Sequence, residues 1–161
     1  MRIIIACDHA GFELKEHLKD VISAWGYEVV DRGAPTYERQ DDYPDYVTPA
    51  ARAVSEDDSR QTRAIIIGSS GQGEAIVANR FAHVRAVVYA GEPRGAQTNT
   101  PTMLMLTREH NDANVLSLGA RFLDIQTAEV AVKTWLETPF SNEERHIRRI
   151  QKIETATSNV T

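Results

Sequence analysis

The chain has 161 residues, 42% hydrophobic and 25% charged, so we expect one ordinary globular domain spanning residues 1–161. The formal net charge of −5 argues against a partner such as nucleic acid or an anionic membrane, because both require a basic surface. The single cysteine, Cys7, excludes an internal disulfide and a cysteine-based metal cluster, and no apolar run is long enough to span a membrane. We therefore expect a soluble, cytoplasmic protein.

Short β-branched runs alternate with amphipathic stretches, which is the pattern of a parallel sheet with crossover helices. The pattern predicts strands at residues 3–6, 27–30, 64–67, 85–89 and 115–118. It predicts helices at residues 11–25, 46–56, 74–81, 103–111, 127–136 and 141–154. We expect an α/β fold, namely a Rossmann-like three-layer α/β/α sandwich with a five-stranded parallel sheet and a C-terminal helix.

The segments between and after these elements carry further signals. Residues 32–44 show little periodicity, and loops of that length in compact domains are often functional. Residues 91–102 are rich in Gly, Pro, Thr and Asn, which indicates a second loop or an insertion. Ser141 and Glu144 fit a capping box at the start of the last helix, and residues 155–161 are expected to form a frayed tail.

The third strand runs directly into the glycine-rich loop GSSGQGE, residues 68–74. Backbone N–H groups at the carboxyl end of such a strand, followed by a helix N-terminus, favour bound negative charge. Ser70 and the loop amides could hold an oxyanion, and Glu74 could move a proton between neighbouring carbons. A tight structural turn, with Glu74 facing solvent and stabilising the helix dipole, explains the same residues on local grounds.

Two polar pairs lie beside other strands. Asp8 and His9 follow the first strand and could contact a sugar hydroxyl or an anion, although Asp8 could equally cap the next helix. His110 and Asn111 stand before the fifth strand. An imidazole can protonate a ring oxygen near neutral pH, and an amide can bond a hydroxyl as donor and acceptor. A structural role for this pair remains open.

A basic group completes the candidates. Arg145 and Arg149 are four residues apart on one helix face, where they could clamp a phosphate or form a solvated surface. Arg121 is a further cation beside a strand end. Taken together, the sequence predicts an acid, a base, oxyanion donors and a phosphate clamp on one edge of the sheet.

The combination of these segments resembles the type B ribose-5-phosphate isomerases, a family that also includes the galactose-6-phosphate isomerase subunits. Four motifs in the same order carry the resemblance: CDHAGF at 7–12, GSSGQGEAIVAN at 68–79, HNDANV at 110–115 and RHIRR at 145–149. The resemblance implies aldose–ketose isomerisation of a small sugar phosphate through a cis-enediol, without metal or cofactor. It also implies a homodimer, with a tetramer open, whose active sites draw on both subunits.

The resemblance also implies roles by position. His110 would open the sugar ring with the help of Asp8, while Ser70 and the amides around Gly71 and Gly73 would stabilise the enediolate. The other implied contacts are His9, Tyr43 and Asn111 to the sugar and Arg121, Arg145 and Arg149 to the phosphate.

The chain departs from the common family pattern at two places. Many members carry a catalytic cysteine where Gly68 stands; another branch lacks that cysteine and has a glutamate at the position of Glu74. The chain resembles that branch, so Glu74 is the expected base. The stretch of residues 94–106 is longer than the usual connection in the family. It lies just before His110 and could reshape the pocket, so the identity of the sugar substrate stays open.

Four functions are compatible with these observations. Interconversion of ribose 5-phosphate and ribulose 5-phosphate is the leading hypothesis, because the galactose-6-phosphate isomerase subunits usually lack a histidine at the position of His110. Another five- or six-carbon aldose phosphate, of the allose- or galactose-6-phosphate type, is the nearest alternative. A nucleotide-binding module is disfavoured because the glycine loop does not follow the first strand. A non-catalytic sugar-phosphate sensor would leave the presence of Glu74, Ser70 and His110 together unexplained.

Overall fold

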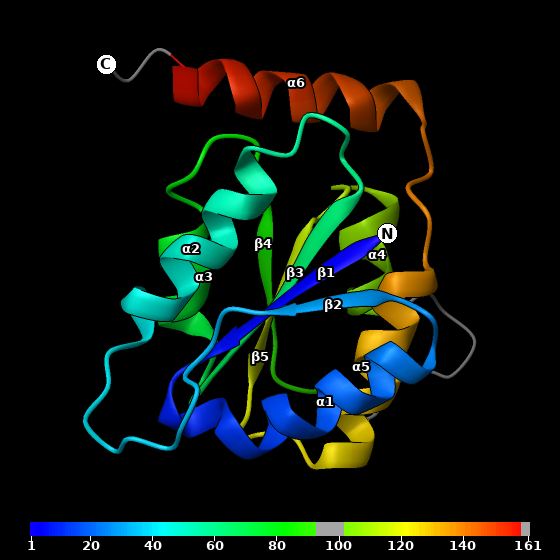
Figure 1. Ribbon diagram of the computed structural model, residues 1–161. Helices are drawn as coiled ribbons and strands as arrows, with labels where there is room; N and C mark the ends of the chain where they lie inside the picture. Colours follow the sequence, from blue (N-terminus) through cyan, green and yellow to red (C-terminus); the bar gives the residue numbers. More distant parts are fainter. Residues whose placement is uncertain (93–101, 159–161) are drawn as a thin grey trace.

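The computed structural model describes residues 1–92 and 102–158, which form helices packed around a single sheet (Figure 1). The strands are β1 (Arg2–Cys7), β2 (Glu28–Asp31), β3 (Thr62–Gly68), β4 (Ala86–Tyr89) and β5 (Val115–Gly119). The helices are α1 (Phe12–Ala24), α2 (Tyr43–Ser55), α3 (Gln72–Ala78), α4 (Met103–Glu109), α5 (Ile125–Glu137) and α6 (Glu144–Ser158), with a 3₁₀ turn, η1 (His9–Gly11), before α1. Every predicted strand and helix is present, with boundaries that differ by a few residues.

The sheet is parallel throughout, with the strand order β2-β1-β3-β5-β4. The three inner strands are buried almost along their full length, because helices cover both faces. This burial explains why these strands appear in the sequence as continuous apolar runs without polar alternation. The expected α/β fold with five parallel strands is confirmed.

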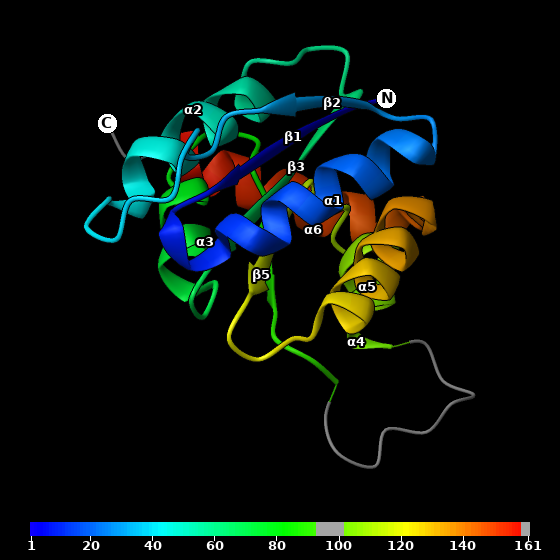
Figure 2. The same ribbon diagram turned by 60° about the horizontal axis from the view of Figure 1, so that its bottom comes forward.

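Two separate cores lie on the two faces of the sheet, because successive side chains of a strand point in opposite directions. On one face, Ile3 and Ile5 of β1 join a buried cluster that includes Trp135 of α5. On the other face, Ile4 belongs to a cluster with Val47 of α2. Figures 1 and 2 show α1, α4 and α5 on the first side and α2 and α3 on the second, which is the expected three-layer arrangement.

The C-terminal helix α6 lies across the amino ends of the strands, at the top of Figure 1. The His146 ring nitrogen Nδ1 lies 3.1 Å from the His110 carbonyl oxygen, and Arg85 donates to Glu154 at 3.0 Å. These contacts tie α6 to the turn that enters β5 and to the start of β4.

The start of α6 differs from the prediction. The helix begins at Glu144, so the expected capping box from Ser141 does not form. Asn142 adopts a left-handed backbone with φ 56°, which breaks the helical path before Glu143, and Ser141 Oγ accepts a 3.4 Å bond from the Glu143 N–H. The helix also continues to Ser158, beyond the expected end near residue 154.

The loop before α2 is shorter than expected. The helix begins at Tyr43, with Pro44 in the first turn, where the missing proline N–H would have no helical partner anyway. Most of the expected insertion at 94–106 lies outside the described residues. Its end forms the first turn of α4, where the Thr102 hydroxyl accepts a 3.3 Å bond from the Met105 N–H.

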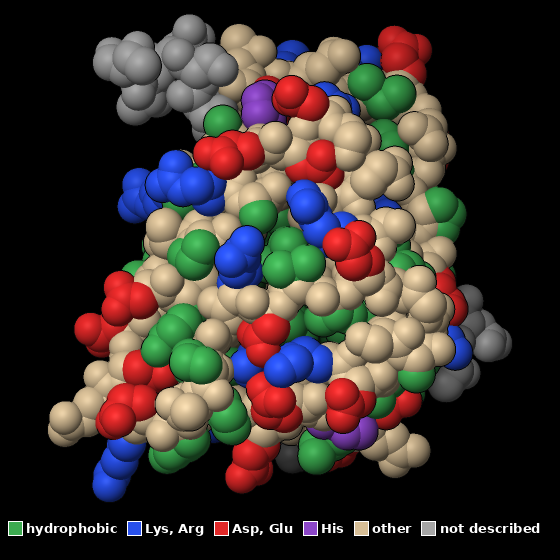
Figure 3. Space-filling model, in the orientation of Figure 1, with side chains coloured by type: hydrophobic (Ala, Val, Ile, Leu, Met, Phe, Trp, Pro, Cys, Tyr) green, Lys and Arg blue, Asp and Glu red, His purple; other side chains and the backbone are tan. Residues whose placement is uncertain are grey.

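None of the described helices is long and apolar enough to cross a membrane. On the face seen in Figure 3, acidic and basic side chains are interspersed, and the described part of that face has no continuous basic surface.

Candidate active site

The carboxyl edge of the sheet gathers the segments that follow three neighbouring strands. Cys7 pairs with Ile67 across β1 and β3, so Asp8 and His9 leave β1 beside the glycine-rich loop that leaves β3. On the other side of that loop, the Arg121 N–H donates to the Ser69 carbonyl at 3.1 Å. The expected proximity of these three segments is therefore present.

The glycine-rich loop, residues 68–74, turns sharply into α3. Gly71 has φ +77°, a left-handed conformation that L side chains rarely adopt. Its carbonyl accepts a 2.6 Å hydrogen bond from the buried Ser117 hydroxyl of β5, which anchors the turn from below. Ser70, half-buried, lies at the exposed side of this turn, where its hydroxyl oxygen is 3.4 Å from the Gln72 N–H.

Glu74 folds back over this loop toward the end of β3. Its side chain is buried, with the residue only 5% exposed, so it does not face solvent. The carboxylate occupies the space beside Gly68: a Cβ built on Gly68 would overlap the Glu74 carboxylate oxygen and carbon. Glycine at position 68 is therefore what allows Glu74 to reach this place. Burial raises the pKa of Glu74, and the negative charge of Asp8 raises it further.

Asp8 both caps a turn of the backbone and lies in the candidate site. Its Oδ1 accepts a 3.0 Å bond from the Ala10 N–H, so it caps the 3₁₀ turn, as the local pattern allowed. The residue is 6% exposed, and burial raises the pKa of its carboxyl group, while the bond from Ala10 opposes that shift. Asp8 and Glu74 are thus two buried carboxylates at one edge of the sheet.

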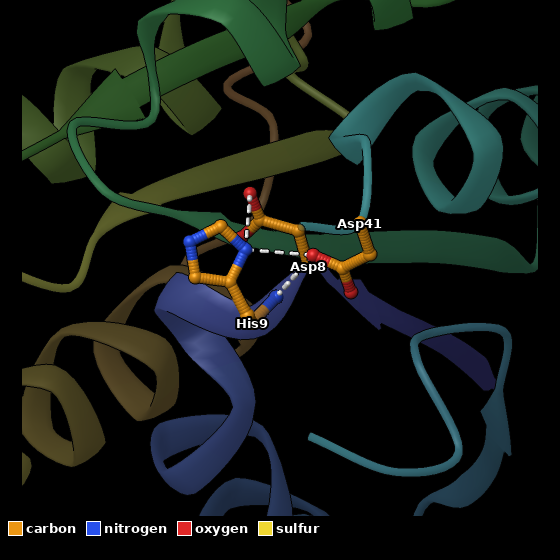
Figure 4. Close-up of side chains that lie close together, drawn as sticks. All are labelled: Asp8, His9 and Asp41. Atoms are coloured by element: carbon orange, nitrogen blue, oxygen red, sulfur yellow. Dashed lines mark hydrogen bonds and ion pairs between the residues drawn. The ribbon is translucent and has the colours of Figure 1, made fainter. Parts of the chain in front are cut away.

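A residue that the sequence reasoning missed, Asp41, contacts His9 (Figure 4). Its Oδ1 accepts a 3.0 Å bond from the His9 backbone N–H and lies 2.7 Å from the His9 ring nitrogen Nδ1. The same nitrogen is 3.8 Å from Asp8 Oδ2. The only signal for Asp41 was its place in residues 32–44, the predicted loop, where Tyr43 but not Asp41 was expected to contact the sugar.

The atoms of Asp8, His9 and Asp41 lie within 4.8 Å of one another, as a metal site would require. However, two ligands bound to one tetrahedral ion at about 2.1 Å lie roughly 3.3 Å or more apart. The 2.7 Å separation of His9 Nδ1 and Asp41 Oδ1 fits a hydrogen bond better than a pair of ligands on one ion.

Tyr43 lies against the same loop. A Cβ on Gly73 would come 2.8 Å from the Tyr43 hydroxyl oxygen, so Gly73 leaves room for the phenol ring. The structure therefore brings together eight of the predicted site residues at the carboxyl edge, namely Asp8, His9, Tyr43, Ser70, Gly71, Gly73, Glu74 and Arg121.

The remaining predicted residues lie at the opposite edge. His110 and Asn111 precede β5, whose five residues span about 16 Å, and Asn114 pairs with the start of β3. The expectation that all the groups share one edge is therefore wrong within a single chain. The reason is topological: in a parallel sheet, residues that enter a strand and residues that leave it lie at opposite ends.

The amino-edge group is itself well organised. The His110 and His146 rings are 4.2 Å apart between centroids, at an interplanar angle of 65°. Arg85 donates to the Asn111 carbonyl at 3.0 Å and so supports the same turn. Arg145 and Arg149 are exposed on α6, and Arg145 pairs with Glu143 at 2.8 Å. His110 and Asn111, on the turn before β5, and Arg145 and Arg149, on α6, all lie toward the amino ends of the strands, and we call these four residues the amino-edge cluster.

The domain is a parallel α/β fold, and its carboxyl edge holds a glycine-rich loop, an imidazole and buried carboxylates. This combination is typical of doubly wound enzymes, which act on small ligands at the carboxyl edge of the sheet. The comparisons define it further. The family model described as Ribose/Galactose Isomerase matches residues 3–153. The chain belongs to this family and is a sugar-phosphate aldose–ketose isomerase.

The relatives are similar over almost their whole length. Ribose-5-phosphate isomerase B of Escherichia coli is 38% identical over 152 residues, covering 94% of this chain and 93% of that protein. Ribose-5-phosphate isomerase B of Mycoplasma genitalium, solved with bound ribulose-5-phosphate, is 31% identical with a TM-score of 0.88, covering 99% of this chain and 97% of that one. The Clostridium thermocellum ribose-5-phosphate isomerase B structure is 35% identical with a TM-score of 0.86 and full coverage of both chains.

Proposed function

We propose that this protein interconverts ribose 5-phosphate and ribulose 5-phosphate through a cis-enediol, with Glu74 as the base. One observation carries the assignment of the base: the Glu74 carboxylate is buried beside Gly68, in the place where many family members carry a cysteine side chain. The family membership and the bound ribulose-5-phosphate of the M. genitalium protein support the substrate.

The reaction moves one carbon-bound proton between neighbouring carbons. The Glu74 carboxylate removes the proton from C2 of the open-chain aldose, and the electron pair forms the C1–C2 double bond of the enediolate. A proton passes from the O2 hydroxyl to O1, and Glu74 returns its proton to C1, so that O2 becomes the carbonyl oxygen at C2 and O1 becomes a hydroxyl. A buried carboxylate with a raised pKa holds the abstracted proton more firmly than an exposed one, which suits it to act as base and then as acid.

The loop next to Glu74 stabilises the charge that develops on oxygen. Ser70 and the backbone amides around Gly71 and Gly73 belong to the same loop between β3 and α3, at the carboxyl edge where the Glu74 carboxylate lies. Donors held in place before the reaction stabilise an enediolate oxygen without reorganisation. The Ser117 bond to the Gly71 carbonyl supports this preorganisation. Tyr43 and His9 are proposed to contact the sugar, and Arg121 its phosphate.

The amino-edge cluster supplies the remaining functions from a second subunit. A homodimer in which the amino-edge cluster of one subunit meets the carboxyl edge of the other would join ring opening by His110, assisted by Asp8, to proton transfer by Glu74. Asn111 would contact the sugar, and Arg145 and Arg149 the phosphate. The roughly 16 Å that separates the two edges within one chain supports this arrangement. Pairing of such dimers into tetramers is compatible with it.

The first test is an isomerase assay over a panel of sugars. We expect ribose 5-phosphate to give a higher kcat/KM than allose 6-phosphate and galactose 6-phosphate. Unphosphorylated ribose should be a poor substrate, because the arginines bind the phosphate. The assay follows ketose formation at matched concentrations. No turnover of ribose 5-phosphate, or preferred turnover of a hexose phosphate, would contradict the proposed substrate.

A second test addresses the shared site. Glu74→Gln and His110→Ala subunits, each inactive alone, are expected to regain up to about a quarter of the wild-type activity when mixed in equal amounts. Half of the dimers formed by random exchange are mixed, and each mixed dimer has one site with both wild-type residues. Activity is measured after subunit exchange has been verified by native mass spectrometry. Continued inactivity in verified mixed dimers would show that each site is built within one chain.

A further inference from the structure

Asp41 is a buried carboxylate that no sequence motif of the site includes. Its side chain is only 6% exposed, and it stands at the end of the long loop, one residue before the N-cap of α2. A single oxygen, Oδ1, contacts His9 twice, at the backbone N–H and at Nδ1 of the ring. The loop also places the Tyr37 ring edge-on to the His9 ring, with the centroids 6.2 Å apart. Two residues of this loop therefore border one imidazole.

The contact at Nδ1 determines how the His9 ring presents its other nitrogen. An ionised carboxylate accepts hydrogen bonds only, so Nδ1 must carry the proton in the 2.7 Å contact. In the neutral ring, Nε2 is then an acceptor with a free lone pair. Figure 4 shows Nε2 on the side of the ring away from both carboxylates, and the His9 side chain is 27% exposed, so this nitrogen is within reach of a ligand.

The second oxygen of Asp41 argues against a purely structural anchor. Among the residues that the structure describes, Asp41 Oδ2 is buried and has no partner with hydrogen-bond geometry. The Tyr46 hydroxyl lies nearby, and burial, the charge of Asp41 and a side-chain interaction with Asp41 together raise the pKa of Tyr46. A buried, half-satisfied carboxylate is costly, and anchoring the His9 backbone would need only a neutral acceptor.

We propose that Asp41 is a positioning residue for substrate binding, because it holds His9 in the Nδ1–H tautomer with Nε2 directed to a hydroxyl of the sugar phosphate. The proposal rests on the proposed isomerase function for the identity of the ligand. It gives the long loop between β2 and α2 a defined role, which is to set the orientation of one side chain of the site.

The experiment compares Asp41→Ala and Asp41→Asn with wild type and uses Asp42→Asn as a matched control. Asp42 is exposed, is adjacent in the chain, and makes no side-chain capping bond to α2. The ring ¹⁵N resonances of His9 are recorded in histidine-labelled protein, with His9→Gln used to identify them among the five histidines. Thermal unfolding of each variant checks that it is folded.

We expect the Nδ1–H tautomer in wild type and Asp42→Asn, and a shift toward Nε2–H in Asp41→Ala. Asp41→Asn keeps an acceptor oxygen, so it should retain most of the Nδ1–H form. KM for ribose 5-phosphate should rise about tenfold in Asp41→Ala with kcat changed less than about threefold, because one ground-state hydrogen bond is lost. Asp41→Asn should lie between Asp41→Ala and wild type.

Two results would overturn the proposal. An unchanged His9 tautomer in folded Asp41→Ala would leave Asp41 as a loop anchor, whatever happened to the kinetics. A changed tautomer with an unchanged KM would show that the orientation of His9 does not affect substrate binding. Failure of the isomerase function is separate, since it would appear as an inactive wild type, and ribose 5-phosphate added to that protein would leave the His9 Nε2 resonance unmoved.

Discussion

Replacement of Glu74 by glutamine is expected to lower kcat for ribose 5-phosphate isomerisation by at least ~10²-fold, with little change in KM. The amide keeps the size and the buried position of the side chain but cannot accept the C2 proton. The substrate contacts at the rest of the site remain, so binding should persist. Steady-state kinetics in both directions measure the effect. Glu13→Gln, an exposed glutamate in the first turn of α1, is the matched control and should retain wild-type rates.

Isotope exchange makes the test specific for proton transfer. In deuterated water, the wild-type enzyme should exchange the C2 proton of ribose 5-phosphate during turnover, and Glu74→Gln should lose that exchange together with the net reaction. If the glutamine variant exchanged the proton at the wild-type rate, another group would have to be the base.

Because the pKa of Glu74 is raised, the activity and the stability of the wild-type protein should depend on pH in a way that Glu74→Gln does not share. Because burial moves the pKa above its ordinary value of 4.5, wild-type kcat/KM should fall, as pH decreases, at a higher pH than an exposed glutamate would cause. The folded state binds this proton more tightly than the unfolded state, so wild-type stability decreases as pH rises from the unfolded pKa through the folded one. Above both values the buried charge is a cost, which the neutral glutamine removes. Glu74→Gln should therefore unfold no earlier than wild type at pH 7, and a lower melting temperature would attribute the lost activity to misfolding.

The sequence was sufficient to predict most of the fold because the inner strands are buried on both faces. Residues 3–6 and 64–67 appear as uninterrupted apolar runs for that reason, and each is followed by residues that must lie at the carboxyl edge. Local geometry was harder to predict. Ser141 and Glu144 fit a capping box, yet the intervening Asn142 takes a left-handed backbone and moves the helix start. Spacing alone does not show which of two local hydrogen-bond patterns is the more stable.

The candidate site was predictable in its residues but only partly in its arrangement. The position of His110 before a strand, and of Glu74 after one, already places them at opposite ends of a parallel sheet, although both belong to family motifs. The contact of Asp41 with His9 joins residues 32 positions apart through an irregular loop, and no periodic pattern reports such a contact. The position of the Glu74 carboxylate beside Gly68 depends on a side-chain rotamer and on loop shape, which the sequence does not specify.

Substitution of Gly68 by alanine is expected to lower kcat by at least ~10²-fold, although it replaces no residue that carries the reaction. A Cβ at this position would overlap the Glu74 carboxylate, so that carboxylate must move away from the end of β3. Displacement of a catalytic group by about 1 Å is enough for losses of this size. Gly26→Ala, at a left-handed turn with open space around it, is the control: it should lower the melting temperature but leave kcat unchanged.

The cause of the loss can be separated from general damage by combining substitutions. If Gly68→Ala acts only by displacing Glu74, it should cost almost nothing further in the Glu74→Gln background, because the two changes remove the same function. Additive losses would instead mean that the alanine disturbs the loop as a whole.

The same geometry predicts a partial rescue by a cysteine. Gly68→Cys combined with Glu74→Ala places a thiol in the space that the carboxylate has left. This double variant should recover part of the isomerase activity that Glu74→Ala alone lacks. A double variant as inactive as Glu74→Ala, in folded protein, would show that the two positions do not share one catalytic space.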